Sequence, residues 1–532
     1  MEREMVDDDQ PAQPRAGTRE WVGLGVIAIA CVLYVMDLTV LHLAVPAISK
    51  DLRPSSTQLL WIIDVYGFMV AGSLITMGTL GDRIGRRRLL MIGAAAFGVT
   101  SVLAAFSQSA EMLIATRALL GLAGATIAPS TLSLIRNMFL DQHQRTVAIG
   151  IWITAFSAGS AIGPLAGGVV LEYFWWGAVF LLAVPVMALL LVLAPRFLPE
   201  YRDPDAGKPD LPSAVLSLMS VLSVIFGFKQ LAQDGIGLVP LASMVAGLGL
   251  GVAFVRRQRV LDDPLIDLRL FERREFSAAL ATYGVGIFIA FGGYLFLPQF
   301  LQLVRGLTPL EAGLWTLPWA LAFVVGSNIT PPIARRLPHA AIMSIGLLVA
   351  ATGFVMFTRI DSSTGFWYIG AASIVLSLGS APLFTLTNDL IIGTAPPERA
   401  GAAAGLSETA AEFGGALGIA IFGSIGLALY RNGVADVLPA GLPAGAIATA
   451  KDTLGGALEV AARLPERVGA ALIDGAREAF TRGLHVATVV SAVGAVLLAL
   501  FVYLMLRRIE PAAEDETAEA AGALAIEERV QT

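Results

Sequence analysis

Long apolar stretches separated by short polar connections run through most of the 532-residue chain. A helix needs about 20 apolar residues to cross the roughly 30 Å hydrocarbon layer of a bilayer. Eight such stretches precede a charged segment and six follow it, near 21–47, 58–80, 89–108, 111–135, 147–170, 176–195, 212–231, 238–255, 277–303, 309–331, 340–358, 365–389, 405–430 and 484–506. The pattern predicts an all-α polytopic membrane protein with about fourteen transmembrane helices and both termini on one side.

The distribution of Lys and Arg predicts the orientation of these spans. Both residue types concentrate in alternate connections, at 83–88, 136–145, 196–208, 256–274, 335–336 and 507–508. Cytoplasmic loops of multi-pass proteins carry the excess of cations. We therefore expect these connections and the tails 1–20 and 509–532 to be cytoplasmic, in a multi-pass protein of the cell membrane. The first tail lacks the basic and then apolar pattern of a cleaved signal peptide, so the first span is expected to be retained.

One connection on the opposite side is too long for a simple turn. It covers residues 431–483, carries mixed charges, and includes the amphipathic segments 458–463 and 468–477. We expect a helical cap outside the membrane. A disordered polar insert is the alternative.

Two segments of the chain resemble each other and indicate a duplication. Residues 154–163 (TAFSAGSAIG) and 409–418 (TAAEFGGALG) share a threonine, two alanines and two glycines at the same spacings. Ordinary packing glycines would explain this similarity alone, but each segment lies in the fifth span of a six-span block. We expect two like-oriented halves, 21–195 and 277–508, joined by a linker at 196–276 that carries two inserted spans. Secondary transporters use such repeats around a central pathway.

Composition supports a bilayer as the solvent and excludes other classes of function. The chain is 56% hydrophobic and 15% charged, with a mean hydropathy of +0.73. Its net charge of −6 offers no basic surface for nucleic acid. The single cysteine, Cys31, excludes an intrachain disulfide and a thiolate metal site. The sequence has no phosphate-binding loop, nucleophile motif or metal-ligand cluster, so we expect neither an enzyme nor a cofactor.

Four acidic residues lie inside predicted spans, where an ionisable side chain costs about 2.5–3.5 kcal/mol on insertion scales. These residues are Asp37, Asp64, Glu408 and Glu412. The two glutamates are four residues apart, on one helical face. Few cations lie at the same depth, and the main one, Arg117, could compensate one carboxylate but not all of them. Two acids at span ends and a lone histidine are weaker candidates, namely Asp389, Glu172 and His42.

Carboxylates without a cationic partner in a low-dielectric medium can exchange protons near neutral pH. An ionised carboxylate also attracts a cationic ligand, so protonation and cation binding exclude each other at one group. This chemistry favours proton-coupled antiport. We assign proton coupling to Asp37, Glu408 and Arg117, and substrate binding to Asp64, Glu412 and Asp37. A structural, hydrogen-bonded acid is the alternative for each carboxylate.

Two glycine-rich segments are candidates for conformational gates. Residues 78–90 (GTLGDRIGRRRLL) combine glycines that permit a tight turn with arginines that anchor the cytoplasmic face. A topology signal alone is the alternative there. Residues 159–168 (GSAIGPLAGG) leave one face of the fifth span without bulk, and the proline permits a kink. The candidate gate residues are Gly78, Asp82, Arg83, Gly85, Arg86, Gly159, Gly163, Pro164, Gly167 and Gly168.

These motifs resemble those of the major facilitator superfamily and, within it, of the fourteen-span drug:proton antiporter family. Residues 78–90 resemble the superfamily signature between spans two and three, which implies a gate-stabilising role for Asp82 and Arg83. Residues 159–168 match the antiporter signature of exporters.

Two further signatures of the family are similar but altered. Arg117, with Gly121 and Gly124, resembles the span-four signature whose arginine is tied to proton transfer, with Leu120 where a glutamine is frequent. Residues 36–46 (MDLTVLHLAVP) resemble the span-one signature, with His42 in place of the usual asparagine.

The resemblance implies export of amphipathic, often cationic compounds, with acids in spans one, two and thirteen serving protonation and cation recognition. The expected mechanism is alternating access. Two halves rock around a central cavity, substrate enters from the cytoplasm or inner leaflet while the acids are deprotonated, and protons from outside displace it. The expected partners are small amphipathic or cationic substrates, protons and membrane lipid, and a monomer is expected. A dedicated exporter of one metabolite, peptide or lipid is the alternative, and a non-transporting membrane scaffold is a remote one.

Overall fold

The computed structural model describes residues 15–202, 210–261, 264–266, 268–394 and 400–507. In these ranges, fourteen helical segments are long and apolar enough to cross a membrane. This confirms the predicted all-α class and the predicted number of spans. The tail at 509–532 and residues 1–14 of the other tail lie outside the described residues.

The helices form three sets along the chain. The first bundle comprises α1 (Thr18–Leu52), α2 (Ser56–Ile84), α3 (Arg86–Ala105), α4 (Ala110–Gly124), α5 (Ile127–Met138), α6 (Gln142–Tyr173), α7 (Ala178–Leu181) and α8 (Ala183–Phe197). The inserted pair comprises α9 (Leu211–Asp234) and α10 (Leu238–Gln258). After η1 (Leu268–Glu272), the second bundle comprises α11 (Arg274–Tyr294), α12 (Leu297–Gln299), η2 (Phe300–Val304), α13 (Pro309–Ala334), α14 (His339–Phe357), α15 (Phe366–Gly393), α16 (Ala400–Ala435), α17 (Ala444–Asp452), α18 (Leu454–Ala461) and α19 (Glu466–Leu506).

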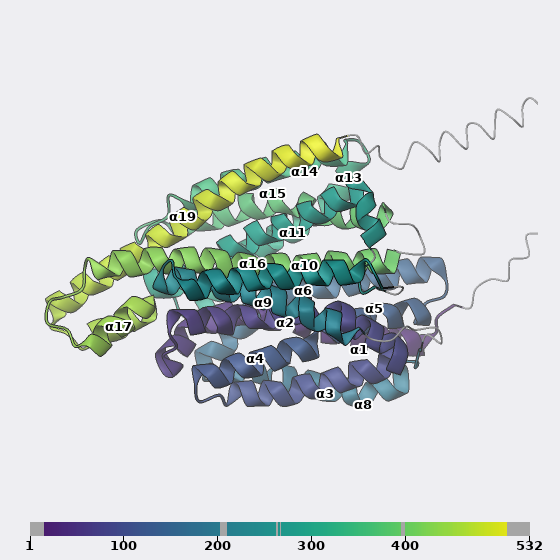
Figure 1. Ribbon diagram of the computed structural model, residues 1–532, viewed down its shortest axis with the longest axis horizontal. Helices are drawn as coiled ribbons and strands as arrows, with labels where there is room; N and C mark the ends of the chain where they lie inside the picture. Colours follow the sequence, from purple (N-terminus) through teal and green to yellow (C-terminus); the bar gives the residue numbers. More distant parts are fainter. Residues whose placement is uncertain (1–14, 203–209, 262–263, 267, 395–399, 508–532) are drawn as a thin grey trace, which may run out of the picture.

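Each bundle has its own hydrophobic core. One cluster of buried apolar side chains draws only on residues 24–198, and another draws only on residues 270–506. A third cluster joins side chains of α1 and α2 to the second bundle, including α17 and α18. The two bundles therefore meet through apolar contacts toward the end of the molecule that carries α17, on the left of Figure 1. The separate cores support the predicted halves 21–195 and 277–508, which remain a prediction.

The segment 431–483 is helical over most of its length. Helix α16 continues to Ala435, the short helices α17 and α18 follow, and α19 runs without a break from Glu466 to Leu506. Asp452 accepts a 2.8 Å ion-paired hydrogen bond from Arg431 of α16 and a 3.1 Å hydrogen bond from Ser56 of α2. The insert thereby contacts both bundles. Its position outside the membrane remains a prediction.

Glycines let pairs of helices approach within backbone contact. A Cβ atom placed on Gly159 of α6 would lie 2.4 Å from the carbonyl oxygen of Val32 in α1. A Cβ atom on Gly418 of α16 would likewise lie 2.4 Å from the carbonyl oxygen of Phe288 in α11. The two similar segments noted in the sequence thus make the same kind of contact, α6 with α1 and α16 with α11.

The inserted pair lies against the seam between the bundles. Ile225 of α9 is buried in a small apolar cluster with Phe68 of α2 and with Ala416 and Ala420 of α16. Helix α10 packs on α9, where the Ser220 hydroxyl donates a 2.7 Å hydrogen bond to the Gly247 carbonyl. Helix α9 is therefore the inserted helix that contacts both bundles.

Candidate functional site

A cavity of about 290 Å³ lies between the two bundles. Helices α1, α2 and α6 form one wall, and α11, α13, α15 and α16 form the other. Its lining includes three predicted site acids, Asp64, Glu408 and Glu412. The rest is mainly apolar and aromatic, with Tyr34, Phe156, Tyr283, Phe291, Tyr294, Trp319, Phe323 and Phe384. An aromatic cavity with a few carboxylates suits an amphipathic cation.

The two glutamates of α16 differ in their contacts. They lie one turn apart on the face of the helix that borders the cavity. The Tyr34 hydroxyl of α1 donates a 2.8 Å hydrogen bond to Glu412 Oε1, which links the two bundles across the cavity. Within the described ranges, no side chain forms an ion pair or hydrogen bond with Glu408. Glu408 is thus the acid that faces the cavity without a partner.

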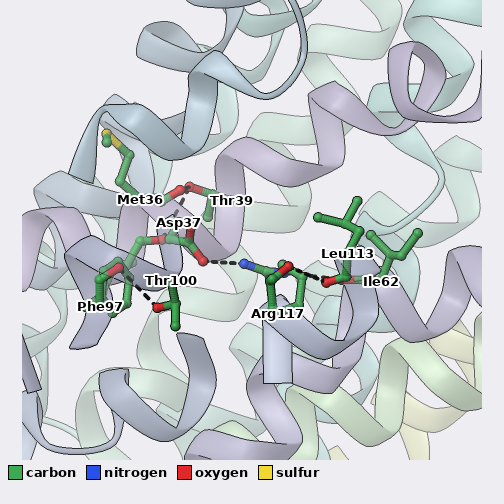
Figure 2. A network of polar contacts seen from close by, with 10 residues as sticks. Met36, Asp37, Thr39, Ile62, Phe97, Thr100, Leu113 and Arg117 are labelled. Atoms are coloured by element: carbon green, nitrogen blue, oxygen red, sulfur yellow. Dashed lines mark hydrogen bonds and ion pairs between the residues drawn. The ribbon is translucent and has the colours of Figure 1, made fainter. Parts of the chain in front are cut away.

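Asp37 forms an ion pair inside the first bundle. Arg117 Nη1 lies 2.5 Å from Asp37 Oδ2, and the arginine side chain is fully buried. The Nε of Arg117 also donates to the Ile62 carbonyl at 3.3 Å, and its guanidinium lies 4.7 Å from the Tyr66 ring centroid. Figure 2 shows the Arg117 side chain in contact with Asp37 on one side and near Ile62 on the other. Asp37 is not among the described residues that line the cavity, so the structure separates it from Glu408 and Glu412.

Asp64 has a cationic partner that sequence analysis missed. Lys229 of α9 places its Nζ 2.9 Å from Asp64 Oδ1, and neither side chain has exposed surface. The expectation of few cationic partners therefore needs correction, because two of the four membrane acids are ion-paired. The available signal was that Lys229 is the only charged residue in the predicted span 212–231. Its pairing with α2 depends on where α9 packs, which hydropathy does not specify.

The weaker candidates occupy different environments. His42 lines the cavity, with its ring edge-on to Tyr294 of the second bundle at a centroid distance of 5.7 Å. Its Nδ1 has no hydrogen-bond partner among the described residues. Glu172 and Asp389 are exposed and are not among the residues that line the cavity.

The turn between α2 and α3 is held by the acid and one arginine of the first candidate gate. Asp82 pairs with Arg86 at 2.5 Å, and Arg86 Nη1 donates to the Pro129 carbonyl of α5 at 3.3 Å. Gly85 has a φ of 110°, which favours glycine, and a Cβ atom there would lie 2.4 Å from Glu200. Gly78 faces α5, where a Cβ atom would lie 3.8 Å from Pro129. Arg83 is exposed.

The second candidate gate, residues 159–168, contributes to two interfaces of α6, one with α1 and one with α13. A Cβ atom on Gly163 would lie 2.0 Å from Thr39 Oγ1, and one on Gly167 would lie 2.2 Å from Val40, both in α1. On a neighbouring face of the helix, the Pro164 carbonyl and Gly168 lie against Gly313 and Leu310 of α13. This segment therefore packs inside the first bundle and also along the seam with the second.

Comparisons with known proteins agree with this architecture. The sequence profile described as Major Facilitator Superfamily matches residues 27–419. The multidrug efflux pump LfrA of Mycolicibacterium smegmatis is 44% identical over 498 residues, which cover 94% of this chain and 98% of that protein. The methyl viologen resistance protein SmvA of Salmonella typhimurium is 37% identical, over 91% of this chain and 97% of its own.

Solved structures show the same fold at lower identity. A bacterial homologue of the human lysosomal transporter Spinster, in an inward-facing and unoccupied conformation, superposes with a TM-score of 0.65 at 18% identity. The match covers 92% of this chain and 98% of that one. With these relatives and the fourteen candidate spans among its described residues, the chain belongs to the major facilitator superfamily, within the fourteen-span drug:proton antiporter family.

Proposed function

We propose that this protein exports amphipathic, cationic compounds in exchange for protons, by alternating access of the cavity between the bundles. One observation carries the proposal: Glu408 lines this cavity and has no ion-pair partner in the described part of the chain. A carboxyl group in such a place binds either a proton or a cation, and each excludes the other. Exchange at one group is sufficient for antiport.

The walls of the cavity support an amphipathic substrate. Aromatic rings from both bundles surround the acids, including Tyr283 and Phe291 of α11 and Trp319 of α13. Aromatic faces bind organic cations through their quadrupole, by about 0.5–2 kcal/mol for each contact. The names of the two relatives, a multidrug efflux pump and a methyl viologen resistance protein, also support export of drug-like compounds.

The direction of transport follows from the predicted orientation. If the arginine-rich connections are cytoplasmic, the end with α17 and α18 faces outward. Both bundles meet there in one apolar cluster, so this conformation is closed toward the outside. Substrate then enters from the cytoplasm or inner leaflet, and protons displace it once the outer end opens. The available energy is about 2.3 kcal/mol per charge per 100 mV and roughly 1.4 kcal/mol per pH unit.

Reconstituted liposomes with a trapped pH dye test this function. We expect ethidium or a quaternary ammonium compound, added under an imposed proton gradient, to trigger proton flux with the wild-type protein. Glu408→Gln should abolish this flux, because an amide exchanges no proton. Glu478→Gln is the matched control, since Glu478 is exposed and paired with Arg482 one turn away. If no cation triggers flux with folded wild-type protein, the proposal fails and a dedicated exporter of a neutral or anionic compound becomes the better hypothesis.

A further inference from the structure

The inserted helix α9 presents one face to the seam between the bundles. Leu218, Ile225 and Lys229 recur at spacings of seven and four residues, which places them on one side of the helix. A Cβ atom on Gly72 of α2 would lie 2.7 Å from Leu218. Ile225 is buried against α2 and α16. The packing of α9 thus carries the Lys229 ammonium into the protein interior, rather than leaving it at the lipid-facing side.

The contacts of Lys229 define a closed ionic site. Its Nζ lies 2.9 Å from Asp64 Oδ1 and 3.7 Å from the ring centroid of Trp61, which is one turn from Asp64 in α2. Both charged side chains have zero exposed surface. Asp64 borders the cavity, and its second oxygen, Oδ2, has no hydrogen-bond partner among the described residues. One carboxylate oxygen is therefore held by the lysine while the other remains unpaired beside the cavity.

Other charged and titratable groups near Asp64 come from four helices besides α9. They are Tyr34, Asp37 and His42 of α1, Tyr66 of α2 together with Arg117 of α4, and Glu408 and Glu412 of α16. Arg117 is the arginine in this set, and it is already ion-paired with Asp37. Lys229 is thus the cation that directly compensates Asp64.

We propose that Lys229 is a fixed internal counterion that keeps Asp64 ionised, so that Asp64 attracts a substrate cation without exchanging a proton for it. Glu408 has no such partner in the described ranges and exchanges protons. The inserted helices thereby set which cavity acids take part in proton exchange. The transport role in this inference rests on the proposed function, whereas its test does not.

The physical reason lies in the burial of the pair. A buried carboxylate that loses its cation is left uncompensated, and binding a proton is the cheapest way to neutralise it. Removing the ammonium should therefore convert Asp64 into a protonated acid like Glu408. Keeping a positive charge at position 229 should prevent this change.

Labelling with dicyclohexylcarbodiimide tests the assignment, because this reagent reacts with protonated carboxyl groups in apolar surroundings. Purified full-length protein is treated at neutral pH and labelled residues are identified by peptide mass spectrometry. In the wild type we expect label on Glu408 and little on Asp64. In Lys229→Met, label on Asp64 should rise about tenfold or more, the change that about 1.4 kcal/mol in the protonation equilibrium produces.

Two variants serve as controls. Lys229→Arg retains the charge and should leave Asp64 unlabelled. Arg257→Met removes an ion-paired cation from the other inserted helix, where Arg257 lies 2.9 Å from Asp210, and should resemble the wild type. Label on Glu408 reports that the cavity of each variant is intact.

Two results would overturn the inference. One is wild-type labelling of Asp64 as strong as that of Glu408, which needs no variant and so decides even if Lys229→Met does not fold. The other is a folded Lys229→Met protein in which Asp64 stays unlabelled. If the labelling pattern is as expected but the wild type shows no cation-triggered proton flux in liposomes, the proposed function fails while the counterion assignment stands.

Discussion

Tyr34 and Glu412 form a 2.8 Å hydrogen bond that joins α1 of the first bundle to α16 of the second, across the wall of the cavity. The acceptor is an oxygen of the Glu412 carboxyl group, and an intramolecular hydrogen bond contributes about 0.5–1.5 kcal/mol. The bond therefore favours the conformation in which the two bundles are closed at the end that carries α17 and α18.

Tyr34→Phe should shift the protein away from this conformation. Loss of the hydroxyl removes the bond but keeps the ring contact with Phe156, whose centroid lies 5.9 Å away. Spin labels on two exposed arginines, Arg88 of α3 and Arg335 after α13, would report the separation of the bundles at the opposite end. We expect a larger population with a short distance in the variant. An unchanged distance distribution would show that this bond does not bias the equilibrium.

The Asp37–Arg117 pair should behave as a buried ion pair whose members depend on each other. Removing one partner of such a pair costs about 3–5 kcal/mol, because the other charge remains uncompensated. We expect Asp37→Asn and Arg117→Met each to lower the melting temperature in detergent strongly, and the double variant to recover much of the loss. Arg257→Met breaks a partly exposed pair and should cost about 0–1 kcal/mol. Additive losses in the double variant would contradict the pairing.

The glycine contacts between helices predict a sharp difference among alanine substitutions. Gly159→Ala and Gly418→Ala each place a methyl group 2.4 Å from a backbone carbonyl of the neighbouring helix. We expect each to cost about 1–3 kcal/mol in thermal unfolding, as overpacking does. At Gly150 and Gly405 an added methyl group meets nothing within 4 Å. Alanine there should be neutral, or stabilising by up to about 1 kcal/mol through helix propensity.

The insert at 431–483 should restrain opening at its end of the molecule. Asp452→Asn weakens the contacts with Arg431 and Ser56, which are partly exposed. Such a loss is worth up to about 1 kcal/mol, or roughly fivefold in an equilibrium. In protein carrying Leu60→Cys, at the small cavity beneath the insert, a water-soluble thiol reagent should label up to about fivefold faster. Glu478→Gln is the control, and equal labelling rates in both variants would refute a restraining role.

The spans could be predicted from the sequence because their length and apolar content reflect the bilayer itself. Membrane acids were identified for a similar reason, since each is costly wherever the helix packs. Their partners were predicted only in part. Arg117 was identified as a possible partner because it lies within a span, but Lys229 lies in an inserted helix whose neighbours hydropathy does not determine. The aromatic lining of the cavity was missed, because Trp319 and Phe384 look like any apolar residue until the packing of α13 and α15 is known.

The backbone contacts of α6 with α1 and of α16 with α11 also constrain how the protein can move. Where carbonyl oxygens and glycines touch, no layer of side chains is left to slide or change rotamer. Each of these helix pairs must therefore move as one rigid body. The helix movements of a transport cycle are then confined to the interfaces between these rigid pairs. These interfaces lie where α6 meets α13 and where α9 lies between α2 and α16. The inserted helix α9 would provide the surface along which the two bundles move past each other. Its Lys229 would move together with α2, to which it is ion-paired.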